Sequence, residues 1–334
     1  MTLTPTRTDE VRRQVEPALR ALVGRLDRRN GRVAGYQLGF WDADGAPADA
    51  AGKGVRPAFA LLAARAAGAR PAAGIPAATA VELVHTFSLL HDDLMDGDTE
   101  RRHRPTAWVV FGPGSAVLAG DALLSLAYEA LAEAPHGAAA ARRLGVAVSR
   151  LIAGQAADIE FEHRSDVTLD ECLQMAADKT AALLSAACAL GALVAGGSDE
   201  VVEGMSRFGQ QVGLAFQLVD DLLGIWGEPE RTGKPVRADL RTRKRSVPVV
   251  RAATSDSPAG REFAALYRAE GELDEAELLR AARLIEEAGA RAWTAEQADQ
   301  LVRAATDTVR ELPVPDDVCA ELSDLAAFIT GRDY

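Results

Sequence analysis

The chain has 334 residues, of which 48% are hydrophobic and 26% are charged, the composition of a soluble globular protein. Its formal net charge of -12 argues against a general nucleic-acid-binding protein. The N-terminus lacks the apolar core of a secretory signal, and we find no uncharged apolar run of about 18 residues that predicts a membrane-spanning helix. Cys172, Cys188 and Cys319 have no disulfide or zinc spacing. We therefore expect a cytoplasmic protein without stable membrane insertion.

Apolar residues recur at three- and four-residue spacing along most of the chain, and alternating strand patterns are not evident. In chain order, this pattern predicts helices over residues 9–28, 57–70, 77–96, 115–133, 138–164, 169–195, 199–226, 259–269, 274–288, 293–310 and 316–331. Glycine and proline cluster at the breaks, and no linker is long enough to separate domains. We expect one all-α domain over residues 1–334, with about the first eight residues disordered.

Two acids share one face near the end of the helix predicted over residues 77–96. Residues 91–106 read HDDLMDGDTERRHRPT, so Asp92 and Asp96 are one helical turn apart. An ordinary helix end running into a solvated loop is one explanation. The other is a hard cation such as Mg²⁺, which takes one or two carboxylates together with phosphate oxygens. Arg101 and Arg102 follow, and their planar guanidinium groups suit phosphate. The stretch therefore indicates a metal–diphosphate site.

A second acidic run ends the helix predicted over residues 199–226. Residues 217–227 read QLVDDLLGIWG, which places Asp220 and Asp221 in an apolar run, where carboxylates are costly unless compensated. Gln217 lies one turn before them, and a basic loop with Lys234 and Lys244 follows. Alone, that loop would be interpreted as a solvated segment. Two acid-bearing apolar helices, each followed by basic residues, predict metal ions held between the helices with a bridging diphosphate.

These motifs resemble the two aspartate-rich motifs of the trans-isoprenyl diphosphate synthases, the polyprenyl synthetase family. The resemblance covers about residues 50 to 250 and includes GKGVRP upstream, LIAGQAADIEFE with Gln155 and Asp158, and DKTAALLSAACALGALVAG with Lys179 and Thr180. It implies an all-α, single-domain bundle of roughly ten or more helices around a central prenyl-chain cavity, the isoprenoid synthase type. It also implies a homodimer.

The resemblance assigns a role to each motif residue. Isopentenyl diphosphate binds at Lys53, Arg56, His85 and Arg102. The allylic diphosphate faces Arg101, Lys179, Lys234 and Lys244. Three Mg²⁺ ions are held by Asp92, Asp96 and Asp220, with weaker support from Asp221. The catalytic groups are Lys179, Thr180 and Gln217, the last two stabilising an allylic cation. The released pyrophosphate is the expected base, whereas His91 on an apolar face is interpreted as a core residue.

The sequence departs from the family pattern at six positions, of which Gly54 and Val55 lie in the upstream motif, where the lysine and arginine remain. His103, Arg237 and Arg243 replace loop glycines of the family. Gly224 takes the place of the third aspartate of the second motif, one turn after Asp220, and has no side chain that could bind a metal. We expect Gly224→Asp to change the Mg²⁺ dependence only modestly.

Product length is expected to depend on the residues beneath the first motif. Ser88, one turn before Asp92, is expected to line the pocket, and its small side chain leaves room there for the growing prenyl chain. The resemblance places Phe87 as the aromatic floor of geranylgeranyl-type enzymes, with ordinary core packing as the alternative. We expect geranylgeranyl diphosphate (C20), made from isopentenyl diphosphate and C5–C15 allylic primers. Farnesyl (C15) and longer (C25 or more) products, a prenyl diphosphate cyclase and a non-catalytic regulatory subunit are the alternatives.

Overall fold

The structure is a computed structural model that describes residues 5–331 except 49, 51, 53, 229–235 and 270, and only the backbone of residues 5–9. Lys53 and Lys234, two predicted diphosphate-binding residues, therefore lie outside the described residues. Contacts divide the chain into two compact units. Unit 1 comprises Met1–Val148, Leu183–Gly209 and Thr308–Asp324, and unit 2 comprises Ser149–Ala182, Gln210–Asp307 and Leu325–Tyr334. The single domain predicted from the sequence stays a prediction.

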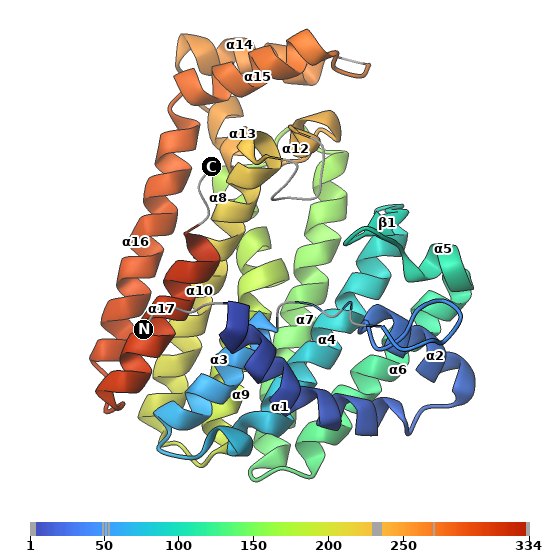
Figure 1. Ribbon diagram of the computed structural model, residues 1–334. Helices are drawn as coiled ribbons and strands as arrows, with labels where there is room; N and C mark the ends of the chain where they lie inside the picture. The colour runs from blue at the N-terminus through green and yellow to red at the C-terminus, as the bar shows by residue number, and fades with distance from the viewer. Residues whose placement is uncertain are drawn as a thin grey trace. The chain divides into compact units, whose positions relative to one another are not determined.

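The fold is all-helical, as predicted (Figure 1). The helices are α1 (Pro5–Val23), α2 (Arg28–Gln37), α3 (Val55–Ala66), η1 (Pro71–Gly74), α4 (Ile75–Met95), α5 (Ala107–Phe111), α6 (Pro113–Ala132), α7 (Gly137–Glu162), α8 (Leu169–Ala176), η2 (Ala177–Ala181), α9 (Ala182–Val194), α10 (Asp199–Trp226), α12 (Ala238–Arg241), α13 (Val247–Ala253), α14 (Pro258–Arg268), α15 (Glu275–Glu287), α16 (Ala290–Arg310) and α17 (Asp316–Thr330). Among the described residues, the strands are β1 (Glu100–Arg101) and β2 (Arg104–Pro105), an antiparallel pair.

The first predicted helix is wrong in its bounds. The pattern over residues 9–28 continues through a break, because α1 ends at Val23 and the carboxylate of Asp27 accepts the N–H groups of Arg29 and Asn30 to cap α2. α1 begins at Pro5 and so extends into the segment expected to be disordered. The helices α2, α5, α12 and α13 were not predicted, and the last three are too short for helical periodicity to be recognised.

In unit 1, α4 packs against α1, α3 and α6. Its residues Val81, Leu83, Val84 and Leu90 are almost fully buried. Burial of these apolar side chains supplies most of the driving force that holds the helix in place. The C-terminal end of α4, where the first acidic pair lies, is thereby fixed to a packed scaffold.

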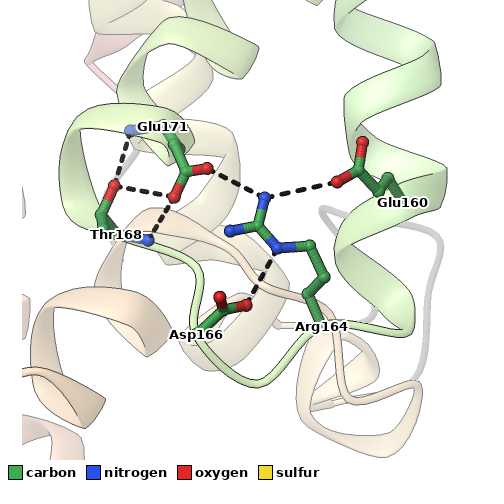
Figure 2. A network of polar contacts seen from close by, with 5 residues as sticks. All are labelled: Glu160, Arg164, Asp166, Thr168 and Glu171. Atoms are coloured by element: carbon green, nitrogen blue, oxygen red, sulfur yellow. Dashed lines mark hydrogen bonds and ion pairs between the residues drawn. The ribbon is translucent and has the colours of Figure 1, made fainter.

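In unit 2, an apolar cluster joins the end of α7, α8, α10 and α13 through Phe161, Cys172, Leu218 and Val247. The connection between α7 and α8 is a polar network (Figure 2). Arg164 donates to Asp166 and Glu171 over 2.9 Å, and Thr168 and Glu171 form a capping box at the start of α8. Hydrogen bonds from the N–H of Thr168 and from the side chain of Arg164 lower the pKa of Glu171 to about 2. These contacts hold the α7–α8 turn together.

Three helical stretches are long and apolar enough to cross a membrane, judged by length and composition only: Pro71–Met95, Pro113–Ala132 and Leu169–Val194. The expectation of no membrane-spanning helix stays a prediction, because length and composition alone do not place a helix in a membrane. In the most apolar 18 residues of each stretch, packing buries 67% in the first and 83% in the third. In the second stretch, which is α6, packing buries only 39%. α6 therefore leaves an apolar face exposed.

Candidate active site

The first acidic pair ends α4 as the sequence predicts. Asp92 lies in the last turn, and Asp96 is the C-cap residue, whose N–H donates to the carbonyl oxygen of Asp92 over 2.8 Å. The side chain of Asp92 is half-buried and that of Asp96 is exposed. Two carboxylates one turn apart at an accessible helix end can present oxygen ligands to a hard cation.

Asp93, between them in the sequence, was missed by the sequence analysis. It is 1% exposed, and its carboxylate accepts a hydrogen bond from Nε of Arg101 over 2.5 Å. Burial raises the pKa of Asp93, and the adjacent Arg101 opposes this shift. The buried carboxylate of Asp93 orients the guanidinium of Arg101, a residue to which the family resemblance gives the allylic diphosphate as its expected ligand.

Arg102 and His103 form the turn between β1 and β2. Both have positive φ, 52° and 59°, as the two central residues of a tight hairpin turn require. The guanidinium of Arg102 lies against Gly52, because a Cβ placed on that glycine would be 2.9 Å from each terminal nitrogen. The structure therefore brings Arg102 to the GKGVRP segment.

Arg56 and His85 meet beside this segment. The guanidinium Nη1 of Arg56, from α3, lies 3.2 Å from Nε2 of His85 in α4. Burial, together with the charges of Arg56 and Arg102, lowers the pKa of His85 well below its ordinary value. The imidazole is therefore neutral, and its Nε2 accepts the hydrogen bond. Glu82, one turn earlier, was not predicted; burial raises its pKa, whereas Arg56 and Arg102 lower it.

Phe87 and Ser88, the predicted chain-length residues, are both buried. The ring of Phe87 contacts His91 edge to face with centroids 4.8 Å apart. His91 in turn packs on α6, where its Nε2 lies 3.1 Å from the carbonyl oxygen of Val117. The ring also lies close to Gly120, since a Cβ added to that glycine would be 2.4 Å from Nε2 of His91. His91 thus packs against α6 with 23% of its side chain exposed, so it is not a fully buried core residue.

The adjacent acids of the second motif have opposite surroundings. Asp220 is exposed, whereas Asp221 is 4% exposed. Burial raises the pKa of Asp221 to about 7 despite the opposing effect of Lys244. Both carboxylate oxygens of Asp221 are engaged, one by Nε2 of Gln217 over 2.8 Å and one by the N–H of Val247 over 2.9 Å. These donors offset the cost of burying the carboxylate.

Thr180 and Gln217, the two predicted cation-stabilising groups, are bonded to each other. The hydroxyl of Thr180 donates to Oε1 of Gln217 over 2.6 Å. Thr180 lies in η2, a π-helical turn of a kind that is frequent at functional sites. Lys179, in the same turn, donates to Asp158 of α7 over 2.5 Å. Helix α7 and the η2 turn are packed tightly at this point, since a Cβ added to Gly154 of α7 would be 2.3 Å from the backbone nitrogen of Lys179.

Lys244 lies near four carboxylates of unit 2. Burial would lower its pKa, but the carboxylates outweigh this effect and raise the pKa above its ordinary value; in decreasing order they are Asp239, Asp221, Asp158 and Asp220. Lys244 is therefore a permanent cation. Arg237 and Arg243, which replace family glycines, flank α12 with φ of 61° and 52°.

Comparison with known proteins identifies the family. The polyprenyl synthetase model matches residues 46–285. A (2E,6E)-farnesyl diphosphate synthase of Mycobacterium tuberculosis is 50% identical over 95% of this chain and 90% of its own length. A geranylgeranyl diphosphate synthase of the same organism is 44% identical over 89% of this chain and 86% of its own length.

Solved structures agree in fold. A polyprenyl synthetase from Streptomyces coelicolor matches with a TM-score of 0.92 and 46% identity over 98% of this chain and 99% of that one. A geranylgeranyl pyrophosphate synthase from Corynebacterium glutamicum, complexed with isoprenyl diphosphate and magnesium, matches with a TM-score of 0.82 and 26% identity over 98% of both chains. The fold is thus that of the isoprenoid synthases. The chain belongs to the polyprenyl synthetase family and is a trans-prenyltransferase of that family.

Proposed function

We propose that the protein is a Mg²⁺-dependent short-chain trans-prenyl diphosphate synthase that condenses isopentenyl diphosphate with C5–C15 allylic diphosphates. The observation that carries the proposal is the cluster of Arg56, His85 and Arg102 beside α4, the helix that ends in Asp92 and Asp96. A prenyl diphosphate cyclase has a single substrate and no use for a second diphosphate site. A non-catalytic subunit is expected to lose the acids or the lysines, and both are present.

The donor set suits Mg²⁺. Asp92, Asp96 and Asp220 offer carboxylate oxygens, which this cation prefers. Within the described part of the chain, no three His, Cys, Asp or Glu side chains are grouped closely enough to hold a metal ion. That finding fits a cation that takes one or two carboxylates and completes its shell with water and phosphate oxygens. Three Mg²⁺ ions, when bound, would stabilise the charge that builds on a departing diphosphate.

Basic side chains of the site would bind and neutralise the allylic diphosphate. Asp93 orients Arg101, and the four neighbouring carboxylates keep Lys244 protonated. Lys179 is held by Asp158 and can exchange that partner for a phosphate oxygen. Lys234, the fourth predicted cation, lies outside the described residues.

Thr180 and Gln217 would serve the allylic cation that remains when the carbon–oxygen bond to the diphosphate breaks. The hydrogen of the Thr180 hydroxyl is committed to Gln217, so the lone pairs on its oxygen remain available to a positive charge. Asp221 fixes the amide of Gln217 from the other side.

His85 would help to hold isopentenyl diphosphate. Because its Nε2 accepts from Arg56, the neutral ring carries its proton on Nδ1, where it can donate to a phosphate oxygen. The double bond of isopentenyl diphosphate then forms the new carbon–carbon bond with the allylic cation. The proton lost in this step goes to the released pyrophosphate.

Geranylgeranyl diphosphate (C20) is the proposed product, with Phe87 as the floor of the pocket. The burial of Phe87 and the small side chain of Ser88 support this proposal. Farnesyl diphosphate (C15) is the second candidate, because the relative at 50% identity is named as a farnesyl diphosphate synthase.

We further propose a homodimer that uses the exposed apolar face of α6. Leu118 of α6 is 61% exposed, and Val109 of α5 and Val146 of α7, also in unit 1, are exposed too. Apolar patches of this kind mark association surfaces. Light scattering is expected to give the mass of a dimer for the wild type and of a monomer for Leu118→Glu. A wild-type monomer would contradict this part of the proposal.

The activity is tested by incubating the purified protein with isopentenyl diphosphate, Mg²⁺ and each of the C5, C10 and C15 allylic diphosphates. We expect elongation of all three primers and C20 as the longest main product by chromatography. A C15 end point would select the second candidate. Absence of elongation from every primer would refute the synthase function.

A further inference from the structure

An arginine of α7 contacts the turn that carries Lys179 and Thr180. Arg150 donates from Nε to a carboxylate oxygen of Asp178 over 2.6 Å, and its Nη2 lies 3.5 Å from the carbonyl oxygen of Ala177. Ala177 and Asp178 are the first two residues of the π-helical turn η2. The guanidinium of Arg150 therefore lies against the start of η2, beside the predicted catalytic residues.

The same guanidinium also reaches α10. Nη1 of Arg150 donates to Oε1 of Gln210 over 3.2 Å, so Arg150 joins α7, η2 and α10 within unit 2. The second carboxylate oxygen of Asp178 is bonded as well, because it accepts from Nε2 of Gln174 in α8 over 2.8 Å. Both oxygens of Asp178 are thus held in place, and its bond to the charged guanidinium is stronger than one between neutral groups.

The directions of Lys179 and Thr180 depend on η2. In this turn the N–H of Ala182 donates to the carbonyl oxygen of Ala177, five residues earlier. A π-helical turn contains one residue more than an α-helical turn, so the side chains that follow it are rotated by about 100° relative to those before it. Such turns are rare. Contacts from other elements are therefore needed to keep η2 in this form.

We propose that Arg150 is a positioning residue for prenyl transfer: through Asp178 it holds η2 so that Lys179 faces the allylic diphosphate and Thr180 faces the allylic cation. This inference rests on the proposed function. Arg150 acts without touching either substrate, because Asp178 is the neighbour of Lys179 in the chain. Misplacing a reacting group by about 1 Å can lower a rate by about 100-fold, so a small relaxation of η2 is enough to impair the reaction.

The chain provides a matched control for Arg150. Arg143, seven residues earlier in α7, forms an ion pair with Glu203 of α10, which lies seven residues before Gln210. The side chains of Arg143 and Arg150 are almost equally exposed, at 36% and 37%. Within the described part of the chain, no hydrogen bond or ion pair links Arg143 to η2. Arg143→Met therefore removes a contact between the same two helices and leaves η2 untouched.

Steady-state kinetics of a small set of variants tests the role of Arg150. The variants are Arg150→Met, Arg150→Lys, Asp178→Ala, the double variant Arg150→Met/Asp178→Ala and the control Arg143→Met. For each one, kcat and the KM values of isopentenyl diphosphate and of the allylic diphosphate are measured. Far-ultraviolet circular dichroism and the unfolding temperature identify any variant that fails to fold. If Arg150→Met is such a variant, Asp178→Ala breaks the same contact from the side of η2.

Arg150→Met and Asp178→Ala are each expected to lower kcat by about 10- to 100-fold and to raise the KM of the allylic diphosphate, because η2 carries the groups that face this substrate. The KM of isopentenyl diphosphate should not change, since Arg56, His85 and Arg102 keep their contacts. A mere loss of folded protein would lower kcat and leave both KM values unchanged.

The remaining variants show whether the two side chains act through one contact. The double variant should be no worse than the poorer single variant, because each single change already breaks the contact. Arg150→Lys is expected to recover part of the loss seen in Arg150→Met, since lysine retains the charge but not the planar fork. Arg143→Met should match the wild type in kcat and in both KM values.

Two kinds of outcome would overturn the inference, and they are distinguishable. If the wild type elongates a primer, normal kinetics of folded Arg150→Met or Asp178→Ala would reject the role of Arg150 alone. An equal loss from Arg143→Met would reject it too, because the effect would then belong to any contact between α7 and α10. Wild-type protein that elongates no primer would reject the proposed function, and this inference with it.

Discussion

The hydroxyl of Thr180 donates a hydrogen bond of 2.6 Å to the side-chain oxygen of Gln217, joining the π-helical turn η2 to helix α10. Asp221 extends this series of hydrogen bonds, because its carboxylate accepts a hydrogen bond from the amide nitrogen of Gln217. In this arrangement a catalytic role for Thr180 depends on its oxygen, whereas its methyl group only packs.

Thr180→Val retains the shape of the side chain and removes the hydroxyl. We expect kcat to fall by about 100-fold with little change in KM, because the lost oxygen faces charge that develops only in the transition state. Thr180→Ser keeps the hydroxyl and is expected to retain most of the activity. Steady-state kinetics with both substrates checks this, and a Thr180→Val enzyme with normal kcat would remove Thr180 from the mechanism.

Gln155 is 6% exposed, and neither its side-chain oxygen nor its nitrogen has a hydrogen-bond partner among the described residues. Burying such an amide is costly. Gln155→Leu is therefore expected to raise the free energy of unfolding by about 1 to 3 kcal/mol in urea denaturation.

Gln217→Leu is the matched control for Gln155→Leu. The amide of Gln217 has two partners, Thr180 and Asp221, so the same chemical change should lower the free energy of unfolding. Equal signs for the two variants would contradict the distinction between a bonded and an unbonded amide.

His85 makes the stability of the fold depend on pH. Its pKa in the folded state is well below the ordinary value of 6.5, so below that pH the unfolded chain binds a proton that the folded chain does not. The free energy of unfolding should therefore fall as pH decreases below 6.5, by up to about 1.4 kcal/mol per pH unit, until the folded-state pKa is reached.

Denaturation curves between pH 7.5 and 5 check this contribution when wild type is compared with His85→Gln. The glutamine does not titrate, so its stability should decrease less on acidification. Parallel pH dependences for the two proteins would mean that His85 is protonated as easily in the folded as in the unfolded state.

His103 and Arg243 both hold a left-handed backbone in place of a family glycine, but only the Arg243 side chain donates hydrogen bonds to backbone carbonyl groups. The side chain of His103 is 85% exposed. Arg243 donates to the carbonyl oxygens of Tyr267 and Gly271 over 2.5 Å and 2.7 Å. A non-glycine residue in this conformation costs about 1 kcal/mol.

His103→Gly is therefore expected to be neutral or to raise the unfolding temperature, because relief of strain offsets the entropy of a glycine in the unfolded chain. Arg243→Gly is expected to lower the unfolding temperature, because two hydrogen bonds to backbone carbonyl groups are lost. Differential scanning calorimetry compares the two, and a larger loss from His103→Gly would reverse the interpretation.

Phe87→Ala should lengthen the main product beyond that of the wild type if the ring is the pocket floor. The variant also loses the edge contact with His91, so a stability loss of about 3 to 5 kcal/mol accompanies it. Phe59→Ala is the matched control, since Phe59 is fully buried against Phe208 in the same unit and should lose stability without changing product length. An unchanged product length from Phe87→Ala would mean that the ring of Phe87 serves only in core packing.

The sequence by itself determined the helical class, the bounds of most long helices and the family. Helical periodicity is a local property, and Asp92 and Asp96 share a face because four residues make about one turn. The same reasoning failed for α12 and for the β1–β2 hairpin, because these elements are too short to show a period and depend on the rest of the fold.

Only the tertiary structure decided which groups meet. Asp93 pairs with Arg101, Thr180 with Gln217, and the carboxylate of Asp239 lies over Gly224. The partners in these pairs lie on different elements, so helical spacing cannot place one partner against the other. Asp220 and Asp221, neighbours in sequence, were separated by the fold into an exposed acid and a buried one. Successive residues of a helix differ by about 100° around its axis, so packing decides which side chain stays in water.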